Sequence, residues 1–125
     1  MEYNSNLEKK LFEKKFVFTA ETTPPDSAEK NILLDKVKSL KNIADAINVT
    51  DSPGANVHMS ALSASIILSQ NGYEPIFQLT VRDRNRLALQ GDLIGASALG
   101  VHNILCLSGD DPKNGDQPET KAVND

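Results

Sequence analysis

The sequence predicts an α/β protein in which parallel strands alternate with helices, as in the first half of an eight-stranded (βα)8 barrel. Three observations predict this class. Short, nearly continuous apolar runs are typical of strands buried on both faces of a parallel sheet. Segments with helical periodicity lie between these runs. The unit of strand and helix repeats at a nearly constant spacing, and right-handed crossovers would place every strand-to-helix loop at one end of the sheet.

Four apolar runs are the predicted strands, and their first residues are 30, 29 and 28 positions apart. The runs cover residues 16–18, 46–49, 75–79 and 103–107. The last run contains the single cysteine, Cys106. We expect this thiol to be buried in the core of a protein from a reducing compartment, because one cysteine cannot form an internal disulfide.

The first expected helix follows the tandem prolines Pro24 and Pro25, which block an earlier start. Asp26 would cap it and Glu29 would reach back, as in a variant of the capping box. Asn42 would help to end it. The apolar face would carry Ile32, Leu33, Val37, Leu40 and Ala44.

The second expected helix begins near Asn56 as a side-chain cap and ends where Gly72 can adopt a left-handed conformation. Its predicted buried residues are Met59, Leu62, Ile66 and Ile67. The third begins after Asp83 or Asn85 and ends at Gly100. Its predicted buried residues are Leu87, Gly91, Ile94 and Ala98.

Loop chemistry favours a barrel over an open doubly wound sheet, although the repeat alone fits both. No glycine-rich dinucleotide or P-loop motif follows the first strand. Polar residues stand instead at each strand end: Glu21, Thr50, Gln78, Thr80 and the run Ser108-Gly109-Asp110. In a barrel these converge on one mouth, where such enzymes have their active sites.

A complete barrel needs about 250 residues, so four strands and three helices account for about half of one. We therefore expect residues 1–125 to be the N-terminal half of a barrel, with an N-terminal extension over 1–14 and a truncated loop over 111–125.

The composition excludes several classes of partner. The net charge of -4 and the pI near 5.1 argue against nucleic acid, because phosphate attraction needs a basic surface. No apolar leader and no apolar stretch of about 18 residues is present, so we expect a soluble cytoplasmic protein without a membrane partner. His58 and His102 have no cysteine or carboxylate at ligand spacing, so no metal site is expected.

Four local patterns carry a resemblance, at residues 18–25, 49–56, 79–85 and 107–110. The most telling are the run from Glu21 to Pro25, Glu-x-x-Pro-Pro, and the pair Gly109-Asp110. In this order the chain resembles the methylenetetrahydrofolate reductase family of flavin-dependent (βα)8 TIM barrels over residues 16–110. The resemblance implies an oxidoreductase of one-carbon metabolism and methionine biosynthesis. Such an enzyme reduces 5,10-methylenetetrahydrofolate to 5-methyltetrahydrofolate with FAD, or FMN, recharged by NAD(P)H or another electron donor.

The resemblance also implies roles for individual residues. Glu21 would be the general acid that protonates a ring nitrogen of the folate, and Asp110 would face the flavin and the pterin and stabilise the developing cation. The positions implied for cofactor binding are Thr50, Asp51, Ala55, Gln78, Ser108, Gly109 and Asp110.

The chain departs from the common family pattern at three places. Gln78 stands where many members carry histidine, and Ser108 stands where many carry arginine. The insertion of Ser52 and Pro53 lengthens the loop before Gly54. The Ser-Gly-Asp sequence is closer to members from acetogens and archaea, some of which work with a partner subunit.

Residue type alone favours purely structural interpretations of these positions. Glu21 would be a solvated loop carboxylate, Asp110 a turn former and Asp83 a helix cap. A cluster of three arginines is expected to be a solvated helix start, although it could meet a flavin phosphate or a folate glutamate tail: Arg82, Arg84 and Arg86.

Two further expectations concern function. The alternative to a reductase is a pterin-binding barrel segment that holds methyltetrahydrofolate for a methyltransferase and performs no redox chemistry. The 125-residue chain itself is expected to self-associate and to have little activity alone, because the strands that would pair with its first and fourth strands are missing.

Overall fold

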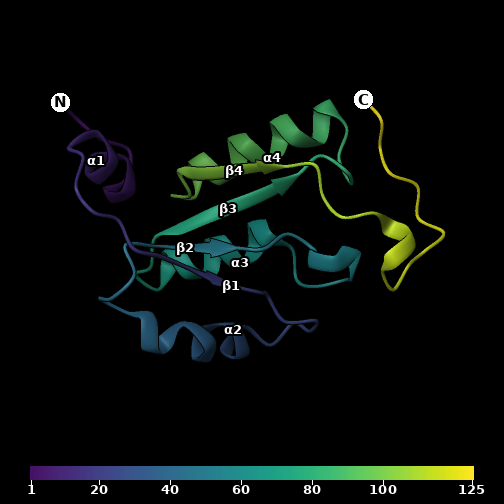
Figure 1. Ribbon diagram of the computed structural model, residues 1–125, viewed down its shortest axis with the longest axis horizontal. Helices are drawn as coiled ribbons and strands as arrows, with labels where there is room; N and C mark the ends of the chain where they lie inside the picture. Colours follow the sequence, from purple (N-terminus) through teal and green to yellow (C-terminus); the bar gives the residue numbers. More distant parts are fainter.

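Four parallel strands pair in sequence order in the computed structural model, which describes residues 1–125. They are β1 (Thr19–Thr22), β2 (Ala46–Val49), β3 (Pro75–Thr80) and β4 (Asn103–Leu107). Figure 1 shows all four arrows pointing the same way. The prediction of an α/β fold with parallel strands is confirmed, and the order is consistent with part of a (βα)8 barrel.

Three helices pack on one face of this sheet. They are α2 (Lys30–Val37), which continues as the 3-10 turn η1 (Lys38–Leu40), α3 (Ala61–Gln70) and α4 (Arg86–Ala98). The short turns η2 (Pro53–Ala55) and η3 (Pro112–Asn114) lie beyond the arrowheads of the strands, whereas α1 (Asn6–Phe12) lies at the opposite end (Figure 1). The sheet therefore has one helix-covered face and one open face.

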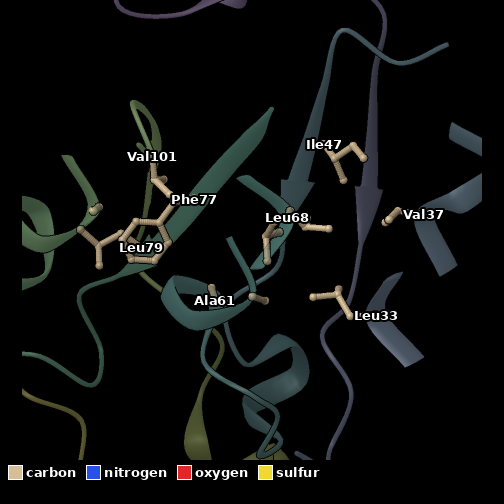
Figure 2. Close-up of a cluster of buried hydrophobic side chains, with 11 residues drawn as sticks. Leu33, Val37, Ile47, Ala61, Leu68, Phe77, Leu79 and Val101 are labelled. Carbon is tan, nitrogen blue, oxygen red and sulfur yellow. The ribbon is translucent and has the colours of Figure 1, made fainter. Parts of the chain in front are cut away.

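The core lies between the sheet and the three helices. Side chains alternate along a strand, so Ile47 of β2 and the pair Phe77 and Leu79 of β3 point to the helices. They pack with residues of α2 and α3, among them Leu33 and Leu68 (Figure 2). Full burial of each large apolar side chain contributes about 1.5–3 kcal/mol. The alternate residues of each strand face the open side, which would be the barrel interior.

The first strand begins later than predicted. Phe16 is 87% exposed and residues 16–18 lie outside the sheet, because no element packs over them. They are held instead by Asp45, whose carboxylate accepts from the Phe18 N–H at 2.9 Å and whose own N–H donates to the Phe18 carbonyl at 2.7 Å. Glu21 therefore lies within β1 rather than after it. The other three strands match their predicted residues, with Thr80 added to β3.

The starts of α2 and α3 differ from prediction. Asp26 does not cap α2, which begins after Glu29 with no side-chain cap. The stretch before it bends over residues 26–28, and the Met59 N–H donates to the carbonyl of Pro25 at 2.7 Å. For α3 the cap is Ser60 rather than Asn56, and its hydroxyl accepts from the Ser63 N–H at 3.1 Å.

The predicted buried faces of α2 and α3 are partly right. Leu33 and Val37 are fully buried, but Ile32 is exposed. In α3 the fully buried residues are Ala61, Ala64, Ser65 and Leu68, and the four predicted residues pack around the core only partly buried: Met59, Leu62, Ile66 and Ile67. The small alanines allow α3 to approach the sheet closely. The predicted C-terminal ends of α2 and α3 are confirmed, since Asn42 and Gly72 adopt left-handed conformations with φ of 63° and 84°.

The predicted buried face of α4 is wrong, although its start at Asn85 and its end at Gly100 are confirmed. Leu87 is 84% exposed, and Gly91, Ile94 and Ala98 are exposed as well. The face carrying Leu89, Asp92 and Ala96 turns toward the sheet, where Asp92 pairs with Arg84 at 3.0 Å.

Cys106 is exposed, contrary to the prediction of a core thiol. It lies on β4, an edge strand with no neighbour on its outer side. Residues 105–107 of this strand are consequently exposed.

The N-terminal helix α1 is an addition to the predicted elements. The carboxylate of Glu74, which precedes β3, accepts from the N–H groups of Asn6 at 3.2 Å and Leu7 at 2.8 Å. Lys10 forms a salt bridge with Asp45, which precedes β2. These contacts fix α1 across the N-terminal ends of the strands, opposite the loops where polar residues gather.

Candidate functional site at the carboxyl ends of the strands

A depression of about 370 Å³ lies on the open face at the carboxyl ends of the strands. It gathers residues of all four strand ends: Glu21, Thr50, Asp51, Pro53, Gln78, Thr80, Leu107, Ser108, Gly109 and Asp110. Seven of the eight site residues predicted from the sequence are among them. The parallel topology explains the convergence, because every strand ends at the same edge of the sheet.

Glu21 lies on β1 and points to the open face, since it pairs in register with Asn48 rather than with a core residue. Its side chain is exposed and takes part in no salt bridge. The carboxyl group is thus free to meet a ligand in the depression.

Gln78 is one of the buried polar residues that line the depression. It lies on β3, is 7% exposed and forms no side-chain hydrogen bond within the protein. The amide atoms of Gln78 are still reached by solvent. The one polar side-chain atom that is both fully buried and without a hydrogen-bond partner is the Ser65 hydroxyl. Buried polar groups are normally hydrogen-bonded, so an unpaired amide beside a depression is suited to binding a ligand through both a donor and an acceptor.

Asp51 is committed to an internal ion pair with Arg84. Its side chain is 3% exposed, and Oδ2 accepts from Arg84 Nη1 at 2.7 Å and from the Thr80 N–H at 2.9 Å. Burial acts to lower the pKa of Arg84, but the hydrogen bonds and charges of Asp51 and Asp92 outweigh it and raise that pKa. The pair ties the loop after β2 to the loop after β3.

Thr50 forms a second link between neighbouring strand ends. Its hydroxyl donates to Thr23 Oγ1 at 3.1 Å, and its N–H donates to the Thr22 carbonyl at 3.1 Å. Thr50 thereby joins the end of β2 to the segment that follows β1.

Arg82 is buried and holds Asp83 in a two-point ion pair. Its Nε and Nη2 donate to the two oxygens of Asp83 at 2.8 and 2.7 Å. The hydrogen bond to Asp83 raises the pKa of Arg82 and lowers the pKa of Asp83. The expected solvated helix start is therefore wrong for Arg82 and Arg84, and Asp83 is an ion-pair partner rather than the cap. Arg86 is 79% exposed and matches the expectation.

Asp110 connects the loop after β4 to two other strand ends. Its Oδ2 accepts from the Gly54 N–H at 2.7 Å, and its carbonyl accepts from Arg82 Nη1 at 3.0 Å. Gly109 precedes it with φ of 88°, a left-handed conformation that favours glycine.

Ala55 lies outside the depression. It lines a separate cavity of about 180 Å³ between η2 and the C-terminal segment. Gly115 packs directly against the carbonyl of Ala55, so closely that a side chain at position 115 would not fit. Ala55 is thus the one predicted cofactor-binding residue that does not line the depression.

None of the helices combines the length and the apolar character that crossing a membrane requires.

Comparison with known protein families gives a match to the model described as methylenetetrahydrofolate reductase, over residues 6–125. The matched residues include all four strands and every residue that lines the depression. A comparison with curated proteins gave no match.

Proposed function

The chain belongs to the methylenetetrahydrofolate reductase family, and from that premise we propose that it forms part of the active site of a flavin-dependent reductase of 5,10-methylenetetrahydrofolate. One observation carries the proposal: Glu21 of β1, Gln78 of β3 and Asp110 of the loop after β4 line one depression. That depression lies at the carboxyl ends of parallel strands, where (βα)8 enzymes have their active sites.

Glu21 is proposed as the general acid. The five-membered ring of the substrate accepts a hydride only after one nitrogen is protonated and the ring opens to an iminium cation. A carboxylic acid beside that nitrogen can donate the proton. Glu21 supports this role because it reaches the open face of the sheet and is not held in a salt bridge.

Asp110 is proposed to stabilise the cation that develops when the ring opens. A fixed carboxylate in a partly enclosed site stabilises positive charge more than water does, because its orientation is set before the reaction. The Gly54 N–H fixes Asp110 at the edge of the depression. The amide of Gln78 would hold a heterocyclic edge through one donor and one acceptor.

The residues of the depression fit the ring system of a flavin and not its phosphates. Gln78 and the strand-end backbone suit the polar pyrimidine edge of the ring. The depression carries three carboxylates, Glu21, Asp51 and Asp110, and no lysine or arginine that would attract a phosphate. When bound, a reduced flavin supplies the hydride, while this chain orients the substrate and supplies the proton.

Several finer properties are part of the proposal. The cofactor is FAD, with FMN as the alternative, and the electron donor is NAD(P)H or another reductant, with a place in methionine biosynthesis. We propose that residues 1–125 supply the first half of the barrel, that further strands complete the flavin site, and that a partner subunit can take part. A relation to the acetogen and archaeal members, and a cytoplasmic location, stay predictions.

The family match favours a reductase over a pterin-binding segment that serves a methyltransferase, and absorption spectroscopy separates the two. The intact protein that contains this chain should be yellow and should be bleached by a reductant. A protein that stays colourless after reconstitution with FAD and FMN would instead favour the methyltransferase alternative.

The role of Glu21 is tested by Glu21→Gln in the intact protein, with the two half-reactions measured separately. We expect reduction of the flavin by its donor to be retained, while oxidation of the reduced flavin by methylenetetrahydrofolate falls about 100-fold, in the range of lost acid catalysis. Glu29→Gln, at an exposed carboxylate beside α2, is the matched control. Folate reduction by Glu21→Gln at the rate of the control would refute the assignment.

A further inference from the structure

Three strand-end loops meet at Asp110, and each side of that residue is held by a different loop. The loop after β2 supplies the Gly54 N–H, which donates to the Asp110 carboxylate at 2.7 Å. The loop after β3 supplies Arg82, whose Nη1 donates to the Asp110 carbonyl at 3.0 Å. The position of this carboxylate thus depends on residues that do not line the depression.

Arg82 is itself fixed in place. It is 6% exposed, and two of its nitrogens are engaged by the two oxygens of Asp83. This two-point contact orients the planar guanidinium, so that its remaining nitrogen Nη1 is directed at the Asp110 carbonyl. A lysine has one nitrogen and no fixed plane, so it cannot reproduce this three-point arrangement.

The loop after β4 rests directly on Arg82. A Cβ added at Gly109 would lie 3.1 Å from the Cβ of Arg82 and 3.3 Å from its Nη1. A side chain at position 109 would press on Arg82, and the φ of 88° is a left-handed conformation that favours glycine.

We propose that Arg82 is the positioning residue of Asp110: it holds the backbone of residues 109–110 so that the carboxylate stays on the Gly54 N–H at the edge of the depression. The positioning itself is a property of the chain, and its consequence for turnover rests on the proposed function of Asp110. Arg82 acts through Asp110, since it does not line the depression itself and borders only the separate cavity of about 180 Å³ beside Ala55.

The positioning is tested in the intact protein that contains this chain by solvent exchange of the Gly54 amide proton, measured by NMR. Arg82→Met should speed this exchange about tenfold, the loss that corresponds to one charge-assisted hydrogen bond. Arg82→Lys keeps the charge and should show the same increase, which preserves the test if Arg82→Met does not fold. Arg86→Met is the matched control and should leave the exchange unchanged. Wild-type exchange in a folded Arg82→Lys protein would overturn the proposal.

The functional consequence is tested by a double-mutant cycle in the intact protein. Asp110→Asn should lower kcat/KM about 100-fold and Arg82→Met about tenfold. If Arg82 acts through Asp110, the double variant should lose no more than Asp110→Asn alone. A product of the two losses, about 1000-fold, would show that Arg82 acts independently and would contradict its positioning role. An intact wild-type protein without reductase turnover would refute the proposed function, whereas the exchange of the Gly54 amide would still decide the positioning.

Discussion

Replacing Arg84 by methionine removes the cation that pairs with a buried carboxylate. The structure allows the resulting loss in the free energy of unfolding to be ranked against the losses from Asp51→Asn and Arg86→Met. The Asp51 side chain is 3% exposed and accepts from Arg84 Nη1 at 2.7 Å. Removing one partner of a buried ion pair costs about 3–5 kcal/mol, because the remaining charge is left without compensation. Asp51 keeps its hydrogen bond from the Thr80 N–H, so we expect the lower end, about 3 kcal/mol.

The reciprocal change, Asp51→Asn, should cost less. The amide oxygen of asparagine can still accept from the Thr80 N–H, and Arg84 keeps its salt bridge with Asp92 at 3.0 Å. We expect a loss of about 1 kcal/mol, the value of a single hydrogen bond. Arg86→Met is the matched control, because that side chain is 79% exposed and its pair with Asp125 should contribute below about 1 kcal/mol.

Urea denaturation followed by circular dichroism measures the free energy of unfolding of all three variants. At roughly 4 °C per kcal/mol for a chain of this size, Arg84→Met should also lower Tm by about 12 °C. The reasoning fails if Arg84→Met is no more destabilising than Arg86→Met, or if Asp51→Asn is more destabilising than Arg84→Met.

Three further predictions follow from the core, from one ion pair and from the sheet edges. Phe77→Ala should lower the free energy of unfolding by about 4 kcal/mol, whereas Phe16→Ala, at an exposed ring, should change it by less than about 0.5 kcal/mol in the same urea assay; equal losses would contradict the assignment of the core. The guanidinium of Arg82 holds the pKa of Asp83 below its ordinary 3.8, so this ion pair stabilises the fold above that pH and its contribution is lost as the pH falls through the lowered pKa. Asp83→Asn should therefore be less stable than wild type at pH 6 and converge with it under strongly acid conditions, and a difference independent of pH would refute the linkage. The free edges of β1 and β4 predict that the 125-residue chain self-associates at micromolar concentration in light scattering, a result that a stable monomer would contradict.

The sequence predicted the parts of the structure that depend on local pattern and on topology. The runs at 46–49 and 103–107 are continuous and apolar, and they form β2 and β4 with the predicted bounds. Glu21 and Asp110 are 89 residues apart, yet parallel strands with a regular repeat place both at one edge of the sheet.

The parts that could not be predicted depend on tertiary contacts. Helix α4 is apolar on several sides, so its periodicity did not show that Asp92 and Ala96 face the sheet. The two partners of Arg84 are Asp51, in a loop 33 residues away, and Asp92, in the next helix. Local charge patterns carry no information about a pair as far apart in the sequence as Arg84 and Asp51. A seven-residue helix such as α1 is marginal by itself, and beside its own cap Ser5 it depends on the distant Glu74, which accepts from its first N–H groups.

Oxidation of a reduced flavin by 5,10-methylenetetrahydrofolate, followed anaerobically by absorption in the intact protein that contains this chain, tests the central claim most directly. We predict that the flavin is reoxidised and that one 5-methyltetrahydrofolate forms for each flavin oxidised. A protein that binds flavin but is not reoxidised by this folate, or that binds the folate without any flavin, would contradict the assignment of the depression to folate reduction.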